Sequence, residues 1–270
     1  MNNSIDWKIV CLEIDEPSKE VGNVMARIWP DKVSTIKLPG RWDVVEKEHL
    51  KDLLWQFKNI NGKILTVYGS GLFHHFTYGL LRNIADLRSN EYTYVHIDQH
   101  TDDADTFGTE FQDAFHCGNF VRDIKRKTLA KKVKYVGCEK VYSEIDKKDI
   151  VYGREIEQNG VKKSLSELLF DAPKQVYVSM DLDVLKPDQM KTGWPDGLMD
   201  LTTLLEIINH IKNNQTILSA DILGFNGNGK YKNPGWCAAS LAVYVIIAGT
   251  LFGEDTTVFR RKHAQLTQHF

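Results

Sequence analysis

Apolar residues fall into short runs that are rich in β-branched and aromatic side chains, and the stretches between several of them have a helical period. The runs favour strands, and they span residues 8–14, 64–68, 92–97, 133–136, 175–179 and 217–222. Apolar residues recur at helical spacing over residues 74–87, 165–170 and 201–211. Alternating strands and helices predict a three-layer α/β/α fold, with a mostly parallel central sheet covered by helices on both faces.

A strongly apolar stretch between Trp236 and Phe252 tests whether the chain crosses a membrane. A membrane span needs about 20 such residues, whereas this stretch is a little short and contains Ser240, Tyr244 and Thr250. We expect a buried helix packed on the sheet. The first residues lack the charged and then apolar run of a signal peptide, so secretion and a membrane partner are not expected.

Length and composition favour one globular domain over residues 1–270, since 42% of the residues are hydrophobic and 26% are charged. The net charge of -2 gives no basic excess that would attract nucleic acid. The four cysteines lie far apart and form no CxxC pair, which indicates neither a disulfide framework nor a zinc knuckle. A cytoplasmic location fits this cysteine usage best.

Chemically active side chains follow two of the predicted strands. Asp98, His100 and Asp102 occupy alternate positions directly after the strand at 92–97, so on an extended chain they share one face. Asp181 and Asp183 follow the strand at 175–179. The carboxyl ends of parallel strands are where such sheets bind ligands. Carboxylates and an imidazole there predict a site for one or two divalent metal ions.

A further histidine, His74, follows the strand at 64–68 after a glycine-containing turn, and we expect its strand to lie beside the one that carries Asp98. The set then holds two imidazoles and four carboxylates. A site for a single ion rarely needs four carboxylates. Two ions bridged by carboxylates and a hydroxide would balance that charge and lower the pKa of the bound water.

Three segments at these residues resemble, in order, the metal motifs of the ureohydrolase family, which includes arginase, agmatinase and formiminoglutamase. They are Gly71-Leu72-Phe73-His74, Asp98-Gln99-His100-Thr101-Asp102 and Ser179-Met180-Asp181-Leu182-Asp183. The likeness continues to about Asn226. It implies an arginase-like fold and two Mn²⁺ ions, both bridged by Asp98 and Asp181. His74 and Asp102 would complete one site, and His100 and Asp183 the other.

The resemblance also implies a reaction, in which a hydroxide held between the metals attacks a guanidinium carbon and urea is released. Asp102 would relay a proton to the leaving amine. His116 resembles the proton-shuttling histidine of the family's His-Gly loop, although Cys117 interrupts that motif. Family members often form trimers or hexamers, so a homo-oligomer is a further expectation.

The chain departs from the family on the substrate side. Gly224 aligns with the glutamate that holds the substrate guanidinium in arginases and agmatinases. Glu13 and Asp15, after the first strand, are our candidates for a replacement substrate-binding carboxylate. Further acids that could serve are Glu16, Asp103 and Asp105.

Other departures bear on the kind of substrate. Phe73 and Lys186 stand where the family has acids, and residues 106–113 lack the Asn and Ser that recognise the α groups of free arginine. A substrate whose α groups are in peptide bonds would not need those contacts. The pattern resembles the peptide arginases of ribosomal peptide maturation, which convert arginine side chains to ornithine. Trp194, Phe107 and Phe111 could line a groove for such a peptide.

Three hypotheses therefore stand. The favoured one is a peptide arginase whose partner is an arginine-containing peptide. The alternative is a metabolic ureohydrolase that acts on free arginine, agmatine or a formimino compound. The third, a non-catalytic metal-binding or peptide-binding module, predicts loss of metal ligands, whereas all six ligand positions are present. A deacetylase relative would use a single zinc ion and fewer carboxylates.

Overall fold

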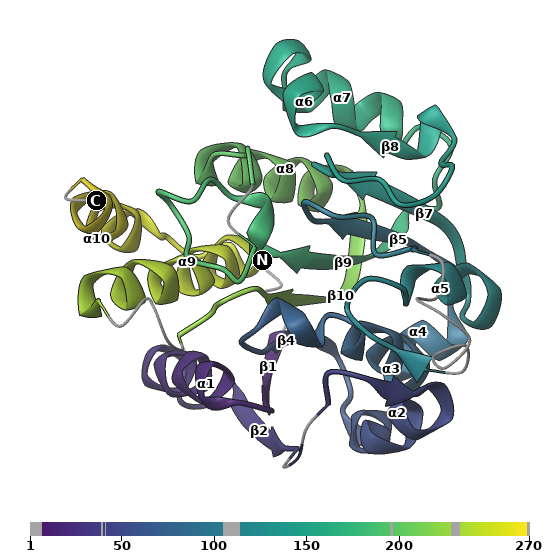
Figure 1. Ribbon diagram of the computed structural model, residues 1–270, viewed down its shortest axis with the longest axis horizontal. Helices are drawn as coiled ribbons and strands as arrows, with labels where there is room; N and C mark the ends of the chain where they lie inside the picture. Colours follow the sequence, from purple (N-terminus) through teal and green to yellow (C-terminus); the bar gives the residue numbers. More distant parts are fainter. Residues whose placement is uncertain are drawn as a thin grey trace, which may run out of the picture.

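A computed structural model describes residues 7–38, 40, 42–104, 114–194, 197–227 and 233–268. Its middle layer is a parallel sheet with the strand order β2-β1-β4-β10-β9-β5-β7-β8, as Figure 1 shows. The strands are β1 (Trp7–Glu13), β2 (Val33–Lys37), β4 (Lys63–Val67), β5 (Tyr92–Ile97), β7 (Ala130–Val136), β8 (Ile150–Val151), β9 (Gln175–Asp181) and β10 (Thr216–Leu223). The short strands β3 (Val45–Glu46) and β6 (Ala114–Phe115) pair separately and antiparallel.

Helices cover both faces of the sheet. The helices are α1 (Glu16–Ile28), α2 (Lys47–Leu53), α3 (Phe76–Asn83), α4 (Ala85–Ser89), α5 (Val121–Lys127), α6 (Gly153–Asn159), α7 (Val161–Leu168), α8 (Leu201–Asn214), α9 (Pro234–Phe252) and α10 (Thr257–Thr267). Val95 and Ile97 of β5 join a core with α1, α7, α8 and α9, whereas Tyr92 and Tyr94 join a second core with α2 to α5. This alternation follows from the two-residue period of a strand. The predicted three-layer α/β/α fold is confirmed.

The predicted elements differ from the observed ones mainly at the edges of the sheet. All six predicted strands are present, but β2 and β8 were missed. In β2 only Ile36 is buried, so the sequence there shows no apolar run. The predicted helix over 74–87 is split into α3 and α4, because Ile84 between them has extended backbone angles.

Helix α9 contains the apolar stretch that raised the membrane question. By length and composition it could cross a membrane, and its apolar window has a mean hydropathy of 1.8. In the structure 67% of that window is buried, and α9 packs against α1, α8 and α10. Burial inside the fold accounts for its apolar composition, as expected from the sequence.

One buried hydroxyl ties α9 to the sheet next to the predicted metal site. The Tyr244 hydroxyl donates to the carbonyl of Tyr68 at 2.9 Å and accepts from the backbone N–H of Phe225 at 3.1 Å. Tyr68 follows β4 and Phe225 follows β10, so these two hydrogen bonds join the ends of the two strands.

We expect Tyr244→Phe to lower the free energy of unfolding by about 1–3 kcal/mol, because it leaves a buried carbonyl and a buried N–H without their partner. Urea denaturation followed by circular dichroism measures the change. An unchanged midpoint of the urea transition would contradict the two hydrogen bonds assigned to the Tyr244 hydroxyl.

Candidate metal centre

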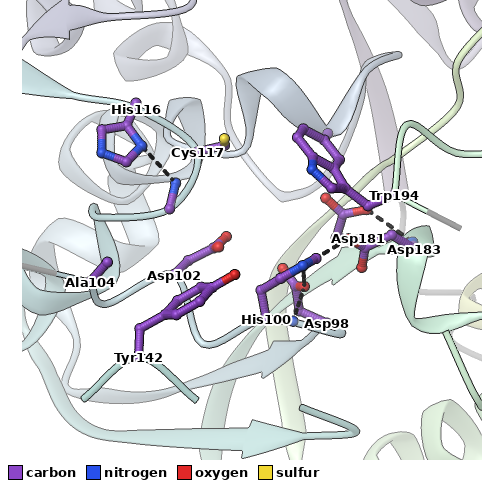
Figure 2. A pocket seen from close by; sticks show the side chains of 12 residues that line it. Asp98, His100, Asp102, Ala104, His116, Cys117, Tyr142, Asp181, Asp183 and Trp194 are labelled. Atoms are coloured by element: carbon purple, nitrogen blue, oxygen red, sulfur yellow. Dashed lines mark hydrogen bonds and ion pairs between the residues drawn. The ribbon is translucent and has the colours of Figure 1, made fainter. Parts of the chain in front are cut away.

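The six predicted metal ligands converge at the carboxyl ends of the strands. Asp98, His100 and Asp102 follow β5, Asp181 ends β9, and Asp183 lies in the short helical turn after it. Strands β5 and β9 are neighbours, so the two carboxylate pairs meet directly. Figure 2 shows these side chains grouped at one end of the sheet.

The expected position of the His74 strand was wrong. β4 pairs with β1 and β10, so β10 and β9 lie between it and β5. The histidine still reaches the cluster, because the turn at Gly71–Phe73 carries the chain from β4 toward β9. His74 Nε2 lies 2.8 Å from Ser179 Oγ of β9, and its Nδ1 lies 3.0 Å from Asp98 Oδ2.

One group of ligands surrounds His74. Its Nδ1 lies 2.9 Å from Asp102 Oδ2 and 3.7 Å from Asp181 Oδ2, in addition to the contact with Asp98. Although it is buried, Nδ1 makes no hydrogen bond of good geometry with these oxygens. Ser179 can accept from Nε2–H, which leaves the Nδ1 lone pair facing the carboxylates. This arrangement fits a shared cation.

A second group surrounds His100. His100 Nδ1 lies 2.9 Å from Asp183 Oδ2 and 3.4 Å from Asp98 Oδ1. Asp98 therefore presents one oxygen to each group, as a bridging carboxylate must. Asp181 is also buried in the cluster, and its Oδ1 accepts from the Asp183 N–H at 3.0 Å.

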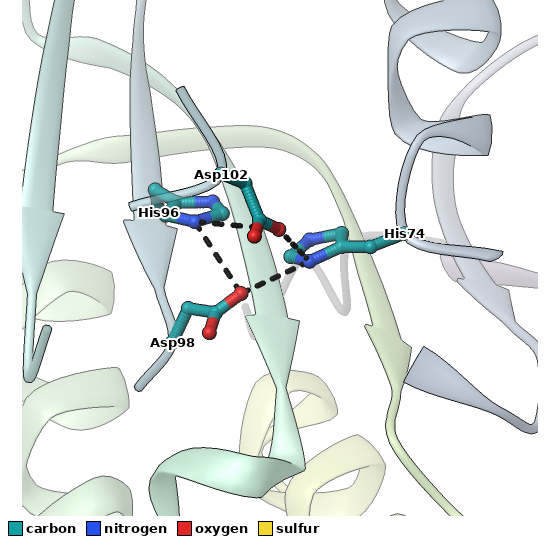
Figure 3. Close-up of side chains that lie close together, drawn as sticks. All are labelled: His74, His96, Asp98 and Asp102. Atoms are coloured by element: carbon teal, nitrogen blue, oxygen red, sulfur yellow. Dashed lines mark ion pairs between the residues drawn. The ribbon is translucent and has the colours of Figure 1, made fainter. Parts of the chain in front are cut away.

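His96 is a further member of the cluster that the sequence interpretation missed (Figure 3). Its Nε2 lies 3.3 Å from Asp98 Oδ2 and 3.1 Å from the carbonyl oxygen of His100. A carbonyl only accepts, so Nε2 carries the proton and His96 orients Asp98. The Tyr94 hydroxyl lies 3.1 Å from the other ring nitrogen. His96 stands two residues before Asp98, and the two-residue strand period could have revealed it.

Burial and mutual repulsion dominate the electrostatics of the cluster. Burial and the charge of Asp98 raise the pKa values of Asp102 and Asp183 to about 7. Burial and then the charge of Asp183 raise the pKa of Asp181 well above its usual value. Burial acts in the same direction on Asp98, but its close contacts with the imidazoles of His100 and His74 outweigh it and lower the pKa. Four carboxylates this close need added positive charge, which divalent cations supply.

Asp102 is held in a strained backbone conformation. Its φ is +49°, a left-handed value that costs a non-glycine residue about 1–3 kcal/mol. The Asp102 carbonyl accepts from the N–H of Val121 at the start of α5 at 3.0 Å, which helps to hold this conformation. In this conformation the Asp102 carboxylate contacts His74.

A pocket of about 210 Å³ opens above the carboxylates. Besides these carboxylates and His100, its described lining consists of Gly71, Ala104, His116, Cys117, Gly118, Tyr142 and Trp194. His116 is held by its loop, since its Nδ1 accepts from the Gly118 N–H at 3.1 Å. Burial lowers the pKa of His116, which keeps the ring neutral near pH 7 and able to accept a proton.

The candidate substrate-binding acids do not line this pocket. Asp15 caps α1 and accepts from the backbone N–H of Ser18 at 2.8 Å. Glu13 lies 3.7 Å from Lys37 on the neighbouring strand β2. Both carboxylates make contacts outside the described pocket lining, and their role in substrate binding stays a prediction.

The other residues predicted to bind substrate lie in different surroundings. Asp103 accepts from Thr101 and Ser143 and so fastens the loop after β7, while Glu16 contacts Lys19. Asp105, Phe107 and Phe111 lie outside the described residues.

Comparison with known proteins identifies the family. Residues 62–248 match the model of the arginase family, and the chain belongs to this family. Members are metal-dependent hydrolases that typically bind a binuclear metal site. The chain is 30% identical over 160 residues to an uncharacterized protein of Thermotoga maritima. That match covers 59% of this chain and 57% of the relative, so it spans little more than half of that protein's length.

Solved structures show the same fold. A hypothetical agmatinase from Burkholderia thailandensis has a TM-score of 0.67 at 18% identity, over 97% of this chain and 87% of that one. Proclavaminate amidino hydrolase from Streptomyces clavuligerus gives 0.67 at 17% identity, over 96% and 93%. Arginase from Bacillus subtilis gives 0.67 at 15% identity, over 92% and 99%. The expected arginase-like fold is thereby confirmed.

Metal binding is expected to weaken as the pH falls from about 8 to about 6, because Asp102 and Asp183, with pKa values of about 7, must lose their protons to bind a cation. Equilibrium dialysis with Mn²⁺ should give an apparent Kd higher by about tenfold or more at the lower pH. A Kd that does not change would contradict the ligand set.

The stability of the metal-free protein should decrease as the pH rises, whereas its affinity for metal increases. Between about pH 4 and pH 7 the raised pKa values of Asp102, Asp181 and Asp183 make the folded chain hold protons that the unfolded chain has lost. These three groups outnumber His75 and His96, whose lowered pKa values act in the opposite sense, so the stability falls as the pH rises through that range. Thermal melts of chelator-treated protein at several pH values test this sign. A melting temperature that rises with pH over that range would contradict the pKa directions.

Proposed function

We propose that the protein is a dimanganese hydrolase that cleaves the guanidinium group of arginine side chains in a peptide, giving ornithine and urea. The observation that carries this proposal is a pair of ligand groups sharing Asp98 beneath a pocket whose other described walls are uncharged. The oxygen-rich ligand set suits manganese. Family membership supports a hydrolytic reaction at that site.

The charges around the pocket support a substrate in peptide linkage. Every carboxylate among the described lining residues is one of the proposed metal ligands, and no Lys or Arg is among them. Free arginine would bring an α-carboxylate that no cation in this lining can pair with. In a peptide the α groups are neutral amides, so burying them near the pocket requires no counter-charge.

The surroundings of the pocket also suit a peptide. Large exposed apolar side chains occur in the connections that leave β4, β7 and β9 at the end of the sheet that carries the pocket. They are Leu72, Val141, Tyr142 and Leu198. Exposed apolar side chains grouped near a pocket are typical of a surface that binds a partner. Residues that flank the target arginine could pack there.

Each metal-site side chain has a role in the proposed reaction. Asp98 and Asp181 would hold both ions, with His74 and Asp102 on one and His100 and Asp183 on the other. The bound ions would supply a nucleophile by lowering the pKa of water into the neutral range. Asp102 would pass a proton to the leaving nitrogen, and neutral His116 would exchange protons between the pocket and solvent. All four cysteines are free, which agrees with the proposed cytoplasmic location.

A metabolic ureohydrolase is the second candidate. Similar solved structures include a hypothetical agmatinase from Burkholderia thailandensis and an arginase from Bacillus subtilis. Agmatine carries no carboxylate, so the absence of a cation in the described lining does not disfavour it as it disfavours free arginine. The decisive experiment must therefore offer agmatine beside the peptides.

Manganese-loaded protein is expected to convert arginine-containing peptides to products lighter by about 42 Da per arginine, the mass lost when a guanidinium is hydrolysed to an amine and urea. Mass spectrometry of parallel incubations with peptides, free arginine and agmatine measures this. Conversion of agmatine or arginine alone would replace the proposal with the metabolic alternative, and no conversion of any of them would reject both.

Asp181→Ala is expected to abolish turnover and to lower the bound metal per chain while the fold is retained, because removing one of several repelling buried carboxylates relieves strain in the metal-free state. Metal analysis and circular dichroism accompany the activity assay. Asp188→Ala, which removes an exposed acid farther along the same connection, is the matched control. Full activity of Asp181→Ala would reject the proposed metal site.

A further inference from the structure

Among the described residues that line this pocket, no carboxylate is left over for a substrate cation. The acids among the described lining residues are Asp98, Asp102, Asp181 and Asp183, and all of them face the two ligand groups. With cations bound there, their charge is already balanced. Of the described lining, the uncharged walls remain to attract a planar cation.

Gly224 shows that the floor of the site has no room for a further acid. A Cβ atom at this position would lie 2.6 Å from Asp181 Oδ1 and 2.8 Å from the backbone nitrogen of Leu182. Its φ of +114° is also a value that side chains rarely adopt. Substitution by an acidic residue would displace a metal ligand, so the counter-group for the substrate has to come from the walls.

Tyr142 forms one wall, and its backbone is fixed. The Tyr142 N–H donates to Thr101 Oγ1 at 3.1 Å, and Thr101 in turn donates to the buried Asp103 at 2.6 Å. These bonds fasten the loop after β7 to the loop that carries the metal ligands. The Tyr142 ring stacks on His100 with centroids 6.0 Å apart and planes at 15°, yet the residue remains 48% exposed. Part of the ring is therefore available to a ligand.

Trp194 forms a second wall on the other side of the His100 ring (Figure 2). Its ring meets His100 edge-on, with centroids 6.3 Å apart and planes at 73°. A Cβ atom on Gly71 would lie 3.2 Å from the Trp194 ring and 2.7 Å from Asp181 Oδ2. The glycine thus allows the indole to pack against the turn beside the metal ligands.

We propose that Tyr142 and Trp194 determine specificity by binding the planar cation of the substrate on their ring faces, which takes the place of a substrate-binding carboxylate. Aromatic faces attract Arg and Lys cations, and the attraction strengthens where water is excluded. Both rings lie beside His100, so a guanidinium held by them is next to the carboxylate cluster. This inference rests on the proposed function for the identity of its substrate.

The test compares an arginine peptide with the same peptide carrying citrulline, whose ureido group has nearly the same shape and no charge. The preference is the ratio of the citrulline-peptide Ki to the arginine-peptide KM. Tyr142→Leu and Trp194→Leu are each expected to reduce it about tenfold, while kcat changes less. Trp55→Leu, which removes an exposed indole from the short helix Trp55–Asn59, is the matched control and should leave the ratio unchanged.

A second pair of variants distinguishes the effect of the electron density of the ring from the effect of its shape. Phenylalanine at position 142 keeps an electron-rich face, whereas pentafluorophenylalanine has nearly the same outline and an electron-poor face. The preference should persist with the first and fall with the second. This comparison decides the matter if a leucine variant loses metal or fails to fold. Equal preferences for the two ring variants, with unchanged preference in the leucine variants that fold, would overturn the proposal.

Failure of this proposal is distinguishable from failure of the proposed function. If arginine is hydrolysed but all variants keep the wild-type preference, the aromatic site is rejected and the hydrolase stands. If no peptide is hydrolysed, calorimetric Kd values for the two peptides replace KM and Ki. A preference for the arginine peptide that depends on ring electrons would then support the cation site, and no preference in the wild type would reject it.

Discussion

Four carboxylates buried within one cluster are the constraint on which the rest of this site depends. Asp98, Asp102, Asp181 and Asp183 are each at most 5% exposed, so water screens their repulsion poorly. The carboxylates that follow β5 are forced close to those at the end of β9, because these two strands are parallel neighbours that end at the same edge of the sheet. A chain that folds this way without added cations keeps protons on several of these groups. Metal binding and proton release are therefore coupled at this centre.

The imidazole of His74 is oriented by a chain of buried polar side chains. His74 Nε2 contacts Ser179, whose hydroxyl lies 3.5 Å from Thr77 Oγ1, and Thr77 donates to Asp221 at 2.5 Å. Asp221 is fully buried, and burial raises its pKa. This chain fixes the ring of His74 through its far nitrogen, just as His96 fixes Asp98 from the side. The ligand geometry is thus set by residues that would not contact a metal ion, which is how proteins commonly position metal ligands.

The sequence was sufficient for the layers of the fold and for placing Asp98, His100 and Asp102 together, because both depend on local periods. Buried strands appear as apolar runs, and alternation places Asp98, His100 and Asp102 on one face. It was insufficient where the outcome depends on the order of strands. β4 is not next to β5, and no local pattern states that His74 crosses two strand ends to reach the cluster. The same limit applied to Glu13 and Asp15, whose position after β1 said nothing about their contacts with Lys37 and Ser18.

The departures from the family pattern have unequal consequences. Phe73 stands where the family motif has an acid, but it is buried against Phe76, with ring centroids 6.1 Å apart. The apolar side chain is therefore part of the core. Lys186 replaces another acid and pairs with Asp200 at 2.8 Å, away from the pocket lining. Gly224 differs from both, because it removes a charge at the cluster and its space is filled by Asp181 and Leu182. All six ligand positions expected from the family resemblance are thus present, whereas a charge expected beside them is replaced by glycine. In the proposed function, such a change would alter which cation is accepted without altering how a metal is held.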